Sequence, residues 1–146
     1  MALHADVREL RPEEYADALA LALRVFGEFE APDYTPEGAE EFQRSLRDGE
    51  YLSKLRFYGA FLDGEMIGTI ATRNAGAHIA LFFVDGAYHR RGVGRQLFRI
   101  VLENSPEGKL TVNSSPFAVP VYHALGFRET DGEQTVRGLR FTPMAL

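Results

Sequence analysis

Two glycines and several arginines lie together in the segment Val84-Asp-Gly-Ala-Tyr-His-Arg-Arg-Gly-Val-Gly-Arg-Gln-Leu97. Gly92 and Gly94 stand at the junction between an apolar run and an amphipathic one, and no acidic residue falls between Tyr88 and Ile100. The pattern predicts a strand, a turn and the first turn of a helix. The first backbone N–H groups of a helix lack partners and the helix dipole is positive there. We therefore expect this segment to bind an anion, most often a phosphate.

The same glycine pattern excludes two common phosphate-binding motifs. A dinucleotide-binding fold needs a third glycine, where this chain has Leu97, and it needs the motif early in the chain. A nucleotide P-loop needs Gly-Lys followed by Ser or Thr, which the sequence lacks. The phosphate compound that remains is coenzyme A, through its pyrophosphate.

Length and composition narrow the function further. The 146 residues suffice for one domain with a sizeable core, and we expect 1–146 to be that domain. The net charge of −5 argues against a general nucleic-acid binder, so the arginines form either a local positive island or a solvated charged face. No apolar run approaches the ~18 residues of a membrane span, and no leader segment is evident. We expect a cytoplasmic protein without a membrane partner.

The chain contains no cysteine. Disulfides, thiolate metal sites and a cysteine nucleophile are therefore excluded. Any acyl transfer has to proceed without an acyl-cysteine intermediate, and we expect no metal.

Hydrophobic spacing predicts the first half of the chain. It favours a short strand over Val7–Leu10 and a helix from Pro12 to about Gly27. An acidic and aromatic loop follows over residues 28–34. Thr35 is the expected N-cap of a second helix that stops near Gly49.

The second half is richer in strands. We expect an antiparallel meander, a helix after Gly94 and then a strand parallel to the last strand of the meander, because a helix joins the two. A helix opening at Ser114 ends at Gly126, and it either kinks at Pro120 or begins its regular part there. A final hairpin turns around Asp131-Gly132. The expected strands are Phe57–Leu62, Met66–Thr72, His78–Val84, Lys109–Asn113, Phe127–Thr130 and Thr135–Phe141.

Two segments of the chain resemble motifs of one protein family. His89-Arg-Arg-Gly-Val-Gly94 resembles motif A of the GNAT superfamily of N-acetyltransferases, whose signature is Gln/Arg-x-x-Gly-x-Gly/Ala. His89 departs from it, since Gln or Arg is usual there. The segment from Asn113 to Phe127 is similar to motif B, in which an Asn closes a strand and a Tyr, here Tyr122, precedes a Gly-Phe pair. The two motifs occur in the family's order after a β-meander.

The resemblance implies an α/β (α+β) fold with a mixed, mostly antiparallel sheet. It implies about six to seven strands flanked by about four helices. The strands ending at Val84 and Asn113 would splay apart, and the acyl donor would lie between them.

The resemblance also implies the chemistry. Acetyl-CoA, or another acyl-CoA, would donate its acyl group directly to a primary amine of a small molecule or peptide, in a ternary complex without an acyl-enzyme. A main-chain N–H near Phe83 or Val84 would polarise the thioester carbonyl. The implied coenzyme-binding residues are Phe82, Phe83, Val84, His89, Arg90, Arg91, Gly92, Val93, Gly94, Arg95, Asn113 and Tyr122.

Three side chains are candidates for proton transfer. Tyr122 occupies the family's general-acid position, and the alternative is a core tyrosine with a satisfied hydroxyl. Glu28 and Glu30 are the candidate bases, and the alternative is solvated loop charge. Asn113 either binds the coenzyme arm or caps the following helix. The acidic loop weakly favours a cationic amine acceptor.

Two other functions fit parts of the sequence. A non-catalytic acyl-CoA sensor would keep the glycine turn without needing Tyr122 or a base. A protein-interaction module would keep the glycines for structure alone. The acceptor, the acyl chain length and the oligomeric state stay open, a homodimer included.

Overall fold

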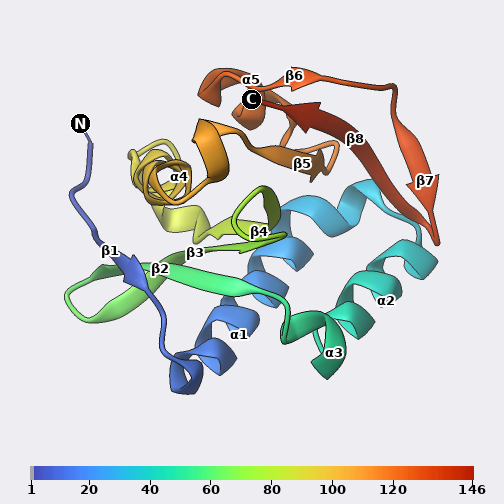
Figure 1. The fold of residues 1–146 in the computed structure, drawn as a ribbon. Coiled ribbons are helices and arrows are strands. Elements are labelled where there is room, and N and C mark those ends of the chain that lie inside the picture. Colours follow the sequence, from blue (N-terminus) through green and yellow to red (C-terminus); the bar gives the residue numbers. More distant parts are fainter. Residues whose placement is uncertain (1) are drawn as a thin grey trace.

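The computed structural model describes residues 2–146, and its centre is one mixed sheet (Figure 1). The strands lie in the order β1-β2-β3-β4-β5-β8-β6, and β7 pairs with β8 beside this path. Only β4 and β5 run parallel, as the helical crossover between them predicts. The mostly antiparallel sheet of the expected fold is confirmed. The strands are β1 Asp6–Glu9, β2 Arg56–Leu62, β3 Glu65–Arg73, β4 His78–Val84, β5 Thr111–Ser114, β6 Arg128–Glu129, β7 Gln134–Val136 and β8 Leu139–Ala145.

Helices cover both faces of the sheet (Figure 1). One buried cluster joins α4 and α5 to the sheet, and another joins α1 and α2 to its opposite face. Helices α1, α2, α4 and α5 turn apolar side chains inward, and the spacing of these side chains predicted the four helices in the sequence. The α-helices are α1 Tyr15–Val25, α2 Pro36–Ser45, α3 Gly49–Leu52, α4 Val93–Glu103 and α5 Val119–Leu125.

The expected loop after the first helix is helical instead. A π-helical turn, Phe26–Glu30, continues α1, and a 3-10 turn follows over Ala31–Asp33. Phe26 is buried and stacks on Phe42, with ring centroids 4.0 Å apart. Burying one such ring contributes about 1.5–3 kcal/mol, which exceeds the ~1 kcal/mol cost of glycine inside a helix. Gly27 therefore does not end the helix.

The second predicted helix also differs at its end. Thr35 caps α2 as expected, accepting a hydrogen bond from the Gly38 N–H at 3.2 Å. The helix stops at Ser45, however, and Gly49 begins the short helix α3 rather than ending α2. Asp48 is the reason, because its carboxylate accepts from two backbone N–H groups of α3.

The ladder between β4 and β5 is very short. Among residues 2–146 it pairs only His78 with Thr111 and Ile79 with Val112, although β4 continues to Val84. The register of β4 against β3 shifts beside Ala80, where β4 carries an extra residue. A bulge of this kind bends a strand and increases its twist. The far half of β4 thus runs without a partner on its β5 side.

The C-terminal hairpin turns at a different place from the one expected. β6 does not pair with β7, and both instead pair with β8. The turn lies at Arg137-Gly138, where both residues have positive φ (52° and 79°), as a two-residue hairpin loop requires. Asp131-Gly132, the more conspicuous turn dipeptide, lies in the connection between β6 and β7.

Helix α5 starts where one of the two alternatives placed it. Pro120 lies in the first turn, where its missing N–H is harmless, so the helix does not kink. Gly126 ends the helix with φ 104°, as expected of a C-terminal glycine.

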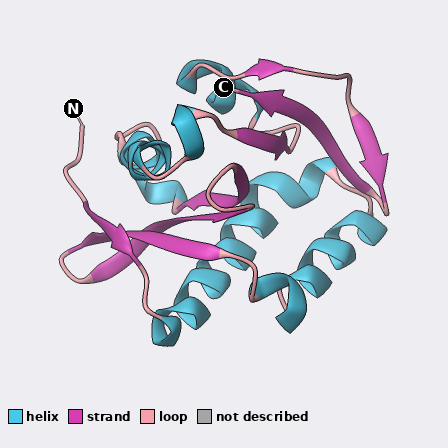
Figure 2. Ribbon diagram, in the orientation of Figure 1, coloured by secondary structure: helices cyan, strands magenta, loops and turns pink. Residues whose placement is uncertain are grey.

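The β7–β8 ribbon extends past β5 to the end of α2 (Figure 2). Its tip contacts α2 backbone to backbone, and a Cβ atom at Gly38 would lie 2.1 Å from the Gly138 carbonyl oxygen. No side chain fits at this contact.

We expect Gly38→Ala to destabilise the protein by about 1–3 kcal/mol, the usual cost of overpacking, in chemical denaturation. Gly49→Ala is the matched control, because nothing lies within 4 Å of a Cβ at that position. Its effect should stay within about 0.5 kcal/mol. Equal stability of the two variants would contradict the close contact.

Candidate active site

The glycine turn presents a run of unpartnered backbone N–H groups. Helix α4 begins after Gly92, whose φ of 87° lies in the left-handed region. The first backbone N–H of the helix that donates a hydrogen bond is that of Gln96, to the Gly92 carbonyl. Within residues 2–146, none of the backbone N–H groups of residues 90–95 donates a hydrogen bond. They stand at the positive end of the α4 dipole. This is the arrangement that binds a phosphate.

The backbone of this turn is strained at one further residue. Arg90 adopts φ 60°, which non-glycine residues rarely do. Strain of this kind gathers at ligand-binding sites. The features of this turn that favour anion binding therefore belong to its backbone and not to its arginine side chains.

His89 has a role that the sequence did not indicate. Its Nε2 donates to the Val84 carbonyl at 2.6 Å, and its ring lies against that of Phe29, with centroids 4.6 Å apart. The side chain thus ties the glycine turn to the end of β4. Nε2 is occupied by this hydrogen bond, so that nitrogen is not free to contact a phosphate.

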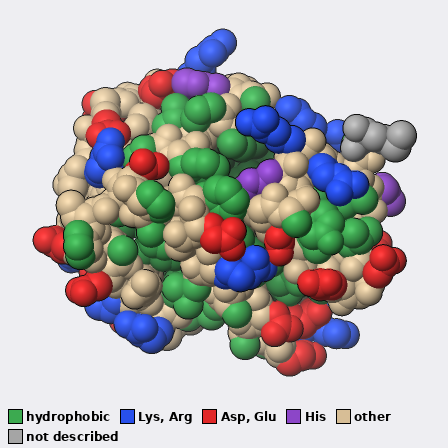
Figure 3. All heavy atoms as spheres, turned by 180° about the vertical axis from the view of Figure 1, so that it is seen from behind, with side chains coloured by type: hydrophobic (Ala, Val, Ile, Leu, Met, Phe, Trp, Pro, Cys, Tyr) green, Lys and Arg blue, Asp and Glu red, His purple; other side chains and the backbone are tan. Residues whose placement is uncertain are grey.

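A cavity of about 620 Å³ opens beside the glycine turn, and we call it the turn cavity. It lies along the unpaired half of β4, between the π-helical turn and α5. The face opposite to that of Figure 1 is hollowed near its centre, with hydrophobic side chains around the hollow and basic ones at its edge (Figure 3). Residues lining the turn cavity include Phe29, Val84, Arg90, Gly94, Phe117 and Val121.

A second cavity, of about 460 Å³, lies between β4, α2 and the β7–β8 hairpin, and we call it the hairpin cavity. Its lining is more polar than that of the turn cavity and includes charged side chains. Residues lining it include Phe42, Tyr51, Arg73, Asn113, Arg140 and Phe141.

The two cavities meet at a small set of side chains. The residues that line both are Glu30, Phe82, Phe83, Ala118 and Tyr122. Two of the predicted proton-transfer residues, Glu30 and Tyr122, are therefore brought together at this junction. They come from the π-helical turn and α5, which are far apart in the sequence.

Tyr122 is buried, but its hydroxyl is not satisfied by the protein. The ring packs edge-on against Phe82 and Phe127, with centroids 6.0 and 5.3 Å away. In the described part of the chain its hydroxyl has no hydrogen-bond partner. Burial, and then the nearby Glu30 carboxylate, raise the pKa of Tyr122 above its usual value. The phenol therefore stays protonated and can donate a proton.

Glu30, in contrast, is suited to accept a proton. Burial raises its pKa to about 7, Asp33 adds to this through charge repulsion, and the Ser115 hydroxyl opposes it. A carboxyl group with a pKa near neutrality suits proton abstraction, because it combines basicity with a sizeable deprotonated fraction.

Glu28 lies elsewhere, although only one residue separates it from Glu30. Its side chain is 50% exposed and lies 3.7 Å from Arg24, one turn earlier on the same helix. It lines neither cavity. The structure thus separates the two candidate bases, and Glu28 fits the alternative of solvated charge.

Asn113 lines the hairpin cavity at the end of β5. It does not cap α5, whose N-cap residue is Ala118. The Ser115 hydroxyl accepts from the Ala118 N–H at 3.3 Å instead. The Ser114-Ser-Pro116 opening of this helix is a capping signal in the sequence that points to Ser115.

Among residues 2–146, no helix is long and apolar enough to cross a membrane. No three His, Asp or Glu side chains are grouped as metal ligands in that part of the chain.

Comparison with known proteins identifies the family of the chain. A family model described as an acetyltransferase (GNAT) domain matches residues 30–146. An Escherichia coli protein described as the uncharacterized N-acetyltransferase YafP is 28% identical over 140 residues, which are 93% of this chain and 90% of that protein.

Solved structures show the same fold. A GCN5-related N-acetyltransferase from Rhodopseudomonas palustris superposes with a TM-score of 0.82 at 22% identity, over 99% of this chain and 96% of that one. The PaiA N-acetyltransferase of Thermoplasma acidophilum, solved in complex with coenzyme A, gives 0.75 at 19% identity, over 98% of each chain. The chain belongs to the GNAT superfamily and is an acyltransferase of that type.

Proposed function

We propose that this enzyme moves an acetyl group from acetyl-CoA directly to a primary amine of a small molecule or peptide, in a ternary complex. The observation that carries the proposal is the junction of the two cavities at Glu30 and Tyr122. One cavity leads from this junction to the unpartnered N–H groups of the glycine turn, and the other leads to the hairpin. A donor and an acceptor can therefore reach the same two proton-transfer groups from opposite sides.

The turn cavity fits coenzyme A. The backbone N–H groups of residues 90–95 would hold the pyrophosphate. The unpaired half of β4, from Phe82 to Val84, would hold the pantetheine arm. The apolar side chains Phe117 and Val121, both exposed, would cover the arm from α5 and the segment before it.

The junction supplies the remaining chemistry. Bound acetyl-CoA supplies a thioester, whose carbonyl oxygen a main-chain N–H near Phe83 or Val84 would polarise. As the amine nitrogen bonds to the acetyl carbon, Glu30 would accept its proton. As the carbon–sulfur bond breaks, Tyr122 would protonate the leaving sulfur. The products are the N-acetyl amine and free coenzyme A, and no covalent bond to the protein forms.

We expect Gly94→Leu to weaken acetyl-CoA binding at least tenfold, which corresponds to about 1.4 kcal/mol. A Cβ at Gly94 would already lie 3.5 Å from the Phe82 ring, so a longer side chain enters the turn cavity. Calorimetry measures the affinity. Gly132→Leu is the control, since a Cβ there has nothing within 4 Å. If Gly94→Leu binds acetyl-CoA as tightly as the parent enzyme, the turn cavity is not the coenzyme A site.

We expect Tyr122→Phe to lower kcat about 10²–10⁴-fold, the usual contribution of a general acid. Acetyl-CoA affinity should stay close to that of the parent, because the ring and its packing are kept. Tyr58→Phe is the control, a buried tyrosine that lines neither cavity. Parent-level turnover in Tyr122→Phe, measured as coenzyme A release, would exclude the acid role.

Glu30 gives a prediction on pH. A base must be deprotonated, so the rate of the parent enzyme should rise as pH rises through about 7, the pKa of Glu30. Glu30→Gln should lower kcat/KM about 10²–10⁴-fold and abolish that limb of the profile. Glu28→Gln should keep both the rate and the limb, because Glu28 lies outside the cavities. The same limb in Glu30→Gln would assign the base to another group.

A further inference from the structure

The geometry points to an acceptor that carries a carboxylate as well as its amine: we propose that Arg73 binds this carboxylate in the hairpin cavity. The proposal names the acceptor class for the activity proposed above and rests on it. Arg73 is not part of either family motif, and it lies at the end of β3.

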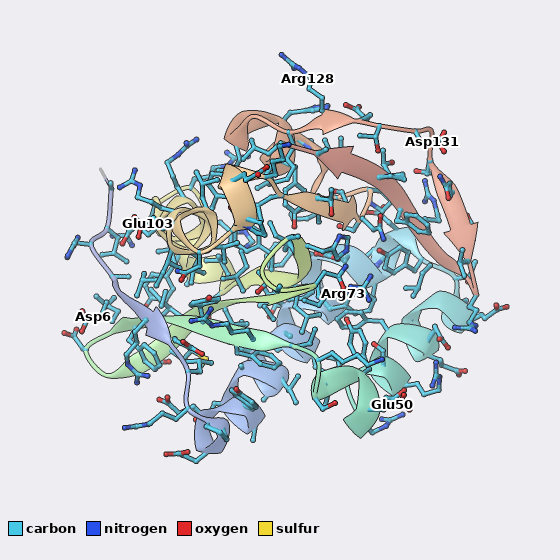
Figure 4. All side chains as sticks on the ribbon, in the orientation of Figure 1. Asp6, Glu50, Arg73, Glu103, Arg128 and Asp131 are labelled. Carbon is cyan, nitrogen blue, oxygen red and sulfur yellow. The ribbon has the colours of Figure 1, made fainter. Side chains whose placement is uncertain are left out.

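Arg73 is a cation without a partner. It lines the hairpin cavity, and Figure 4 shows it near the centre of the molecule, between the β3–β4 hairpin and α2. No carboxylate in the described residues forms an ion pair with it. Its Nε is buried and has no hydrogen-bond acceptor within residues 2–146.

The other charged groups of the cavity are already engaged. Glu41 contacts two arginines, Arg44 and Arg137. Arg140 pairs with Glu133 and donates to the Asp33 carbonyl. Asp48 accepts from the first N–H groups of α3. The cavity thus has no carboxylate to spare for Arg73 except Glu30, which lies at the junction with the turn cavity.

The groups that face Arg73 are neutral. Burial, and then the Arg73 charge, lower the pKa of His78 to about 4, so this cross-strand neighbour is uncharged at neutral pH. Burial also keeps the Tyr51 phenol protonated, since it raises the pKa of that group. The positive charge of Arg73 is therefore not neutralised by these neighbours, and it can attract an anionic ligand in the cavity.

A carboxylate is the anion that matches this guanidinium. Two parallel N–H groups on one edge of arginine bind the two oxygens of a carboxylate in a bidentate pair. The Arg73 Nε is buried, so an entering carboxylate would pair with the terminal N–H groups of the guanidinium. Arginine, unlike lysine, supplies these groups with fixed geometry.

The register of the sheet sets the distance between the two ends of the acceptor. Arg73 pairs with His78, whereas Phe83 lies at the junction of the cavities. Phe83 pairs with Thr69, four residues before Arg73 on β3, so the two ends are about 14 Å apart at the usual rise of a strand. Even after the Arg73 side chain shortens this span, an amine and a carboxylate on the same carbon cannot reach both ends. The acceptor is therefore an extended aminocarboxylate, such as an ω-amino acid or a short peptide.

The test compares 6-aminohexanoate with its neutral amide, 6-aminohexanamide, which has the same amine and the same length. Calorimetry measures binding to the enzyme–coenzyme A complex, and coenzyme A release measures turnover with acetyl-CoA. We expect the parent enzyme to bind the acid at least tenfold more tightly than the amide, and to bind glycine much more weakly than either.

The variant Arg73→Met should remove this preference. It should raise KM for the acid at least tenfold while leaving kcat and the affinity for the amide unchanged, because the amine end is not altered. Arg73→Lys should restore part of the preference. Arg47→Met is the control, since Arg47 is exposed and lines neither cavity. Acetyl-CoA affinity and the melting temperature verify that each variant is folded.

The outcomes separate this proposal from the one on which it rests. Equal affinity of the parent for acid and amide, or equal loss of both in Arg73→Met, overturns the carboxylate site. Glycine binding as tightly as 6-aminohexanoate overturns the inferred spacing. If the acid binds in an Arg73-dependent way but no coenzyme A is released, the carboxylate site stands and the proposed acetyl transfer fails.

Discussion

The site depends on the failure of β4 and β5 to stay paired. Their ladder covers two residue pairs and ends beside the extra residue at Ala80. Beyond that point the edges of β4 and β5 that face each other have no neighbouring strand, and two cavities occupy the space that a continuous sheet would fill. The cost of leaving these groups unpaired is comparable to that of lost hydrogen bonds, and a ligand that bonds to the strand edge offsets it. Helices α4 and α5 pack in one buried cluster on one face of the sheet, and α1 and α2 pack in another on the opposite face.

The parts of the fold that follow from short-range signals could be predicted from the sequence. Helix caps and hairpin turns placed α2, the end of α5 and the β-meander, because each rests on a few adjacent residues. Arg137-Gly138 was missed as a turn, since Asp131-Gly132 is the stronger dipeptide signal and nothing local says which one pairs. The continuation of α1 past Gly27 does not follow from local signals either, because it depends on the stacking of Phe26 on Phe42, which is a tertiary contact.

The site was predictable to the same extent. The glycine turn is a local motif, and its unpartnered N–H groups follow from the start of a helix. Glu28 and Glu30 are equivalent in the sequence, and only the π-helical turn sends one to solvent and the other to the junction. Arg73 carries no signal in the sequence at all, because its isolation depends on which carboxylates other residues occupy. Electrostatic environment, unlike backbone geometry, is a property of the folded whole.

The contact of Gly38 with Gly138 joins α2 to the last hairpin, away from the glycine turn. Part of the wall of the hairpin cavity comes from α2 and the last hairpin, which join each other at this backbone contact. The glycine turn, α4 and the end of β4 take no part in the contact between Gly38 and Gly138. Under the proposed function, substitutions along residues 137–141 would reshape the acceptor cavity while the glycine turn keeps its form.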